Sequence, residues 1–144
     1  MPPFHVTLHA APADDSDLLE RLPPIEVDER RIAPLGLRSD QLQRPFTVSF
    51  EEAAERLGRL ERLYFEPDGS FVWVGAASGE RSAGQLDGVL YVRAGRLQYV
   101  ELKGTCPPDA FAELLRALDV SRRLIIVQLV RQALYVDARE WMGE

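Results

Sequence analysis

The chain has 144 residues, of which 46% are hydrophobic and 28% charged, and this balance is typical of one globular domain rather than a fibrous or disordered chain. Its net charge of −6 argues against general binding to nucleic acid, although it does not exclude a local basic groove. The apolar runs are too short to cross a membrane, the N-terminus lacks a secretory signal, and one cysteine cannot form an internal disulfide, so a cytoplasmic protein is expected.

Residues 1–48 are predicted to form an N-terminal arm packed on the domain. Apolar and polar residues alternate over 4–9, which predicts a half-buried strand. The acidic run at 14–17 is a suitable cap for a short helix, which the prolines at 23–24 would end. Further prolines and a glycine break the rest of the arm, so an extended path is expected there.

Residues 49–144 are predicted to form the α/β core of a single layered domain. Serine and glutamate at 49–52 match a capping box, and apolar residues recur at helical spacing after it, so a helix over 50–61 is predicted. The β-rich stretches 63–65 and 70–74 flank a Pro-Asp-Gly turn, which predicts a hairpin.

The second half of the core has the pattern of a hairpin, a helix and two strands. In chain order we predict a mobile loop over 76–84, paired strands over 86–92 and 96–103, a helix that starts at 107–109, and strands over 124–130 and 133–136. The run at 124–130 is almost continuously apolar, as expected for a strand buried on both faces. About 20 residues separate it from Lys103, which is enough for a right-handed helical crossover between parallel strands. A mixed sheet with helices packed on it is therefore expected.

The turn of the second hairpin decides which side chains meet. A two-residue loop would need a positive φ at Ala94, which lacks the conformational freedom of glycine. A three-residue loop over 93–95 would instead place Gly95 in the left-handed conformation that such a turn requires. With that loop, Asp87 lies opposite Glu101 and their side chains share one face of the sheet.

Both faces of this hairpin are apolar at mid-strand. One face is expected to carry Leu90, Val92, Val100 and Leu102, and the other Val89, Tyr91, Leu97 and Tyr99. Helices or the N-terminal arm should therefore cover both faces.

Asp87, Glu101 and Lys103 are the group of residues that best suits chemistry. Adjacent carboxylates repel each other, and a divalent cation such as Mg²⁺ or Mn²⁺ relieves that repulsion. A cation held there can activate water and neutralise charge on a phosphoryl group, while the lysine, the only one in the chain, orients the nucleophile. The alternative is structural: Asp87 begins a strand, and Glu101 and Lys103 form an exposed charge pair.

The pattern Asp87-Gly88 … Glu101-Leu102-Lys103 resembles the PD-(D/E)XK nuclease superfamily. The predicted element order over 49–130 resembles the αβββαβ core of that superfamily. The resemblance implies that Asp87 and Glu101 bind Mg²⁺ or Mn²⁺ and that Lys103 is the catalytic lysine. The family often adds an acidic residue from the first helix, and Glu55 is the candidate because the capping box leaves it free.

Two classes of function are therefore expected. One is a metal-dependent phosphodiesterase or nuclease, or a descendant that kept the fold without the activity. The other is a non-catalytic binding or adaptor protein, for which an acidic surface and a small size are natural. The chain also resembles small uncharacterised bacterial proteins, which implies no function. His5 and His9 share a strand face but lack the further ligands that a metal site needs, and the sequence leaves the partner and the oligomeric state open.

Overall fold

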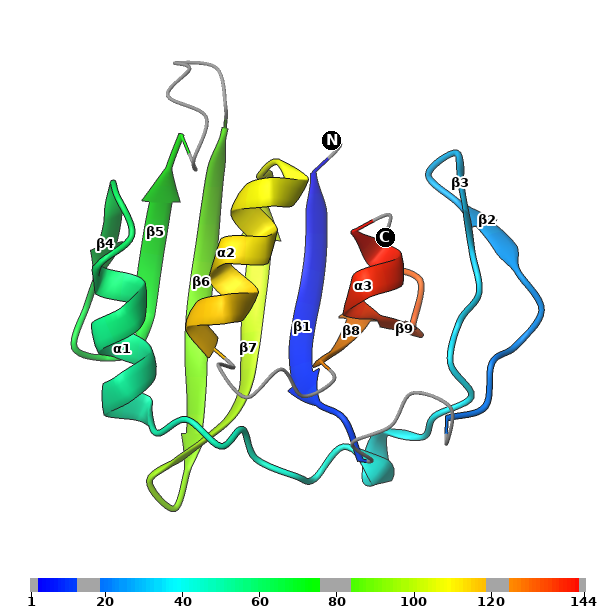
Figure 1. Ribbon diagram of the computed structural model, residues 1–144, viewed down its shortest axis with the longest axis horizontal. Coiled ribbons are helices and arrows are strands. Elements are labelled where there is room, and N and C mark those ends of the chain that lie inside the picture. The colour runs from blue at the N-terminus through cyan, green and yellow to red at the C-terminus, as the bar shows by residue number, and fades with distance from the viewer. Residues whose placement is uncertain (1–2, 13–18, 76–83, 119–124, 143–144) are drawn as a thin grey trace.

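The computed structural model describes residues 3–12, 19–75, 84–118 and 125–142, which form a sheet with helices on one side (Figure 1). The strands are β1 (Phe4–Ala10), β2 (Ile25–Val27), β3 (Arg30–Ile32), β4 (Leu63–Phe65), β5 (Ser70–Val74), β6 (Gln85–Arg93), β7 (Arg96–Gly104), β8 (Ile125–Leu129) and β9 (Leu134–Asp137). The helices are α1 (Phe50–Gly58), α2 (Pro108–Leu118) and α3 (Ala138–Trp141), with a 3₁₀ turn at Ser39–Gln41. This is an α+β fold, and no helix in the described ranges is long and apolar enough to span a membrane.

Two predicted segments fall mainly outside the described residues. The loop predicted over 76–84 is one of them, and the short helix predicted from 14–17 onward is the other. Residues 19–24, which are described, are not helical; Arg21 instead bridges to Leu35 in an extended conformation.

Seven strands form one sheet in the order β4-β5-β6-β7-β1-β8-β9, and each neighbouring pair in it is antiparallel. The prediction of a mixed sheet is therefore wrong. α2 does connect two strands that run in the same direction, β7 and β8, but β1 lies between them and pairs with both. The N-terminal strand thus occupies the centre of the sheet, while later residues of the arm run beside β9, where Leu35 bridges to Tyr135.

Local signals in the sequence explain both main helices. The Ser49 hydroxyl accepts the backbone N–H of Glu52 at 3.1 Å, and the Glu52 carboxylate accepts the N–H of Ser49 at 3.4 Å, which confirms the capping box of α1. Phe111, Leu114 and Leu118 follow helical spacing in the sequence, which predicts an apolar stripe on α2, and the structure confirms it because all three are fully buried. Both predicted hairpins, β4–β5 and β6–β7, are present.

The β6–β7 hairpin closes through a two-residue turn, so the predicted three-residue loop is wrong. Ala94 and Gly95 have φ angles of 54° and 77°, and Arg93 pairs with Arg96 across the turn. The left-handed conformation of Gly95 is confirmed. Ala94 adopts the strained conformation that we expected to exclude this turn, because the twist of the two long strands favours it.

A bulge in β7 restores the face of the side chains that the shorter turn alone would have reversed, although not the predicted register. The pairing slips by one residue between Tyr91 and Val92, which leaves one residue of β7 without an opposite partner. The three-residue loop predicted that Asp87 lies opposite Glu101. Beyond the bulge, Asp87 instead lies opposite Lys103. The side chains of Asp87, Glu101 and Lys103 still point to one face. The shorter turn and the bulge each shift the pairing by one residue, and a shift of two residues leaves side chains on the same face.

The helices cover one face of the sheet, so the prediction that both faces of β6 and β7 are covered is wrong. The side chains of this hairpin that point toward the helices are at most 3% exposed, namely Leu90, Val100 and Leu102. Tyr91 on the other face is 37% exposed. Near the turn the bulge reverses the prediction for Leu97, which is buried in the core opposite Val92, while Val92 is exposed at the end of its strand.

The uncovered face is closed only at the β8–β9 end. There Leu35 and Leu42 of the arm pack against Ile126 in a small second core. Over β6, β7 and β1, no described helix lies on this side of the sheet, and we call this region the open face (Figure 1).

We expect the two residues of the β6–β7 turn to respond in opposite ways to substitution. Ala94→Gly should raise the free energy of unfolding by about 0.5 kcal/mol, because relief of the left-handed strain outweighs the extra entropy of glycine. Gly95→Val should lower it by about 1–2 kcal/mol. A Cβ atom at Gly95 meets no atom within 4 Å, so this loss is conformational alone. Denaturant unfolding measures both effects, and unchanged stability in both variants would contradict the strain.

Candidate functional site

Three rows of side chains cross the open face from β6 through β7 to β1. The strand pairing places Asp87, Lys103 and His5 in the first row, Val89, Glu101 and Thr7 in the second, and Tyr91, Tyr99 and His9 in the third. Successive rows share the face because every second residue of a strand points the same way. The three residues that the motif singles out therefore lie next to two histidines and two tyrosines.

The Glu101 carboxylate is held by one neighbour from each adjacent strand. The Nε2 atom of His5 lies 2.9 Å from Oε2, and the Tyr91 hydroxyl donates to Oε1 at 3.4 Å. The hydrogen bond to His5 is the main reason that the pKa of Glu101 lies below its ordinary value, and the charge of Lys103 acts in the same direction. The side chains of His5 and Glu101 are 21% and 27% exposed, so solutes can reach them.

A stack of three rings lies beside this carboxylate. The rings of Tyr91 and Tyr99 are nearly parallel with centroids 4.4 Å apart, and His9 stacks on Tyr99 at 5.5 Å. The stack runs across three strands, from the exposed ring of Tyr91 to the half-buried ring of His9. It therefore forms a column of stacked rings that is fixed at its inner end and open at its outer end.

The inner end of the stack is fixed by hydrogen bonds. The Thr7 hydroxyl donates to Oε1 of Gln128 at 3.0 Å and lies 2.8 Å from Nε2 of His9. A hydroxyl has one proton to donate, so His9 must be the donor to Thr7 and carries its proton on Nε2. Burial lowers the pKa of His9 to about 4, so this imidazole is neutral at physiological pH.

Asp87 and Lys103 complete the open face at its first row. Oδ1 of Asp87 accepts a hydrogen bond from the amide nitrogen of Gln85 at 2.9 Å, and both Asp87 and Lys103 are exposed. Gly88, the second residue of the motif, is explained by packing. A Cβ atom there would lie 2.1 Å from the buried ring of Phe71, so the glycine is required whatever Asp87 does.

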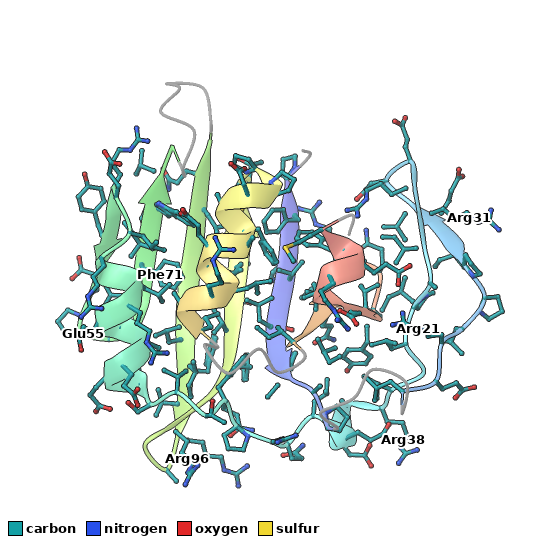
Figure 2. The ribbon with its side chains drawn as sticks, in the orientation of Figure 1. Arg21, Arg31, Arg38, Glu55, Phe71 and Arg96 are labelled. Carbon is teal, nitrogen blue, oxygen red and sulfur yellow. The ribbon has the colours of Figure 1, made fainter. Side chains whose placement is uncertain are left out.

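Glu55, the helix acid expected to join Asp87 and Glu101, does not lie near them. α1 packs on the helix-covered side of the sheet, and the Glu55 carboxylate pairs with Arg59 at 2.5 Å on the outer side of that helix (Figure 2). In the described parts of the chain, no three His, Cys, Asp or Glu side chains are close enough together to hold a metal ion.

Sequence reasoning placed Tyr91 and Tyr99 on the same face of the hairpin as the motif, but it missed that His5 and His9 belong to this surface. Part of the signal was visible, because the alternation over residues 4–9 places His5 and His9 on one face of a strand. What it could not indicate is that this strand lies next to β7, since the pairing joins residues almost a hundred positions apart.

We expect His9 to make the protein sensitive to mild acid. As the pH falls below 6.5, the unfolded chain takes up a proton on His9 while the folded chain does not, so stability falls until the pH nears the folded value of about 4. Between pH 6.5 and 5 this should cost the wild type as much as about 2 kcal/mol, a loss that His9→Phe should largely avoid while keeping the stack. Unfolding free energies at the two pH values test this, and equal losses in both proteins would contradict it.

Comparisons with protein-family models, with curated proteins and with solved structures find no match to the chain. The resemblance to the PD-(D/E)XK nucleases therefore remains an expectation from the motif and the element order.

Proposed function

We propose that the chain is a non-catalytic binding protein that docks a basic partner protein on the open face. The observation that carries the proposal is the stack of Tyr91, Tyr99 and His9, which stands on a part of the sheet that no helix of the described residues covers. Tyrosine is enriched at protein interfaces and among the residues that dominate binding energy, because its rigid ring buries a large area and its hydroxyl finds a partner.

Exposed apolar side chains also lie on the same side of the sheet nearer its β4 edge, in the row that leads to Asp87. Tyr64 on β4 lies opposite Val72 on β5, which lies opposite Asp87 on β6, so all three side chains point to the same side. Tyr64 is 63% exposed, and Val74, two residues along β5, is 41% exposed. Exposed apolar groups on the same side of the sheet as the stack favour docking of a macromolecule.

The charge favours a basic partner. The chain carries a net charge of −6, and the Tyr91 hydroxyl of the stack donates to the carboxylate of Glu101. The described open face has two carboxylates, Asp87 and Glu101, and three cations, Lys103, Arg93 and Arg96. The net charge of the whole chain is therefore what attracts a positive protein and disfavours an acidic one. It also disfavours nucleic acid, whose bases would otherwise stack on the rings.

Tyr91→Ser should remove partner binding, whereas Leu22→Ser should not. The two side chains match in exposure, at 37% and 39%, but Leu22 belongs to the arm and lies outside the open face. The experiment captures partners from an extract of the producing cells on the immobilised wild type and on both variants, and mass spectrometry identifies them. The purified partner is then titrated at two salt concentrations.

The expected result is one basic protein that the wild type and Leu22→Ser bind equally. Tyr91→Ser should bind it at least about tenfold more weakly, and higher salt should weaken binding by the wild type. An equal effect of the two substitutions, an acidic partner, or no partner would each contradict the proposal.

A second candidate is a metal-dependent phosphodiesterase, favoured by the shared face of Asp87, Glu101 and Lys103. In this proposal the order α1, β4 to β7, α2, β8 corresponds to the αβββαβ core with one strand more. Asp87 and Glu101 would hold Mg²⁺ or Mn²⁺, which supplies an activated water when bound, and Lys103 would orient that water. The fit is partial, because Glu55 lies across the sheet and Glu101 would have to release both of its hydrogen-bond donors.

Titration with Mn²⁺ separates the two candidates. For a binding protein we expect Mn²⁺ to shift the melting temperatures of the wild type, Glu101→Gln and Glu113→Gln equally, because no cation site stabilises the fold. Glu113 is an exposed acid on α2 and controls for general effects of charge. A shift that only Glu101→Gln loses would establish the enzyme, provided that the wild type cleaves DNA or RNA and Lys103→Ala abolishes cleavage at an unchanged melting temperature.

A further inference from the structure

A cavity of about 330 Å³ lies at the beginning of β1, beyond the end of the open face. It is enclosed by the first residues of β1, the turn after β8, the β2–β3 hairpin and α3. Figure 1 shows this hairpin beside α3, at the end of the molecule away from α1. The volume lies at the lower end of the range for sites that bind small molecules.

The inner wall of the cavity is apolar and rigid. Ile32, Leu129 and Trp141 line it and are each at most 5% exposed. The ring of Phe4 meets Trp141 edge-on with centroids 5.0 Å apart, which fixes both rings. Such a wall suits the hydrocarbon part of a ligand, because its shape is already formed before the ligand binds.

Two arginines give the cavity a positive rim on an acidic chain. Arg30 uses Nη2 to bond the backbone carbonyls of Glu140 and Trp141, and its other guanidinium nitrogens have no partner among the described residues. Arg131 is exposed, and within the described ranges its guanidinium makes no hydrogen bond or ion pair. Asp28 is the one carboxylate among the described lining residues, so the cationic groups outnumber it.

The hairpin that closes the cavity has a strained turn. Asp28 and Glu29 have φ angles of 49° and 66°, values that residues other than glycine rarely adopt. A two-residue turn between paired strands requires a positive φ at both positions, as at Ala94 and Gly95, so the turn itself accounts for these angles. The hydrogen bonds from Arg30 to the backbone carbonyls of Glu140 and Trp141 hold this hairpin against α3.

We propose that this cavity binds a small amphipathic carboxylate, with its carboxylate on the guanidinium groups of Arg30 and Arg131 and its apolar part against Trp141. A guanidinium presents paired N–H donors that match the two oxygens of a carboxylate, and the pair is strongest where apolar walls exclude water. The proposal stands apart from the partner-binding function, because His5 is the one open-face residue that also lines the cavity.

Octanoate and 1-octanol are the probes, because they have equal numbers of carbon atoms and differ in the head group. Isothermal titration measures their affinities, and the fluorescence of Trp141 in the wall reports binding independently. We expect octanoate to bind the wild type at least tenfold more tightly than octanol. Arg131→Gln should weaken octanoate at least tenfold and leave octanol unchanged, whereas Arg93→Gln, an equal charge change at the distant β6–β7 turn, should alter neither.

Arg131→Gln is a fair test because the exposed side chain supports nothing else in the described structure, and an unchanged melting temperature checks this. Equal affinities for octanoate and octanol would overturn the carboxylate assignment. Equal losses in Arg131→Gln and Arg93→Gln would assign the effect to net charge and overturn the site. The cavity proposal also fails if millimolar octanoate changes neither the heat signal nor the tryptophan fluorescence.

Discussion

The pairing of β1 with both β7 and β8 is the constraint on which the rest of the structure depends. Both of its hydrogen-bonding edges are in use, so that Thr7 lies opposite Glu101 on one side and opposite Gln128 on the other. One face of β1 carries Val6 and Leu8, which are fully buried in the main core beneath the helices. The other face carries the imidazole groups. Without β1, the sheet would separate into β4–β7 and β8–β9, two parts that α2 and the arm connect.

A sheet with helices on one side has to protect its other side by different means. Here the rings of Tyr91 and Tyr99 cover the backbone while their hydroxyls stay close to water. Thr7 is only 8% exposed although no described helix lies above it, and its hydroxyl is bonded on two sides. The side chains of the open face are thus held in fixed positions and remain accessible to solvent. A surface that is ordered before binding loses less entropy when a partner binds.

How much the sequence alone can predict depends on how far apart the interacting residues lie along the chain. The capping box of α1, the two hairpins and the buried stripe of α2 depend on residues a few positions apart, and each was predictable. Asp87, Glu101 and Lys103 share a face, as the sequence argument held, but a shorter turn and a bulge combine to produce this result. The bulge has no local signature, so no count along the sequence could have included it.

The residues that β1 contributes to the site could not be predicted from local sequence patterns. His5 meets Glu101 across 96 positions of the chain, and an alternating strand indicates which residues share a face without indicating which strand lies beside it. Glu55 shows the same limit. Its helix was predicted from local residues, whereas the side of the sheet on which that helix packs depends on the whole topology.

The edges of the sheet are protected where its open face is not. The outer edge of β9 is occupied by the arm, since the N–H of Leu35 donates to the carbonyl of Tyr135 at 2.7 Å. At the opposite edge, β4 is only 3 residues long. Edges that are short or occupied offer no template for adding strands from another molecule. The chain can therefore keep a tyrosine-rich face accessible in a crowded cell without polymerising edge to edge into amyloid-like ribbons.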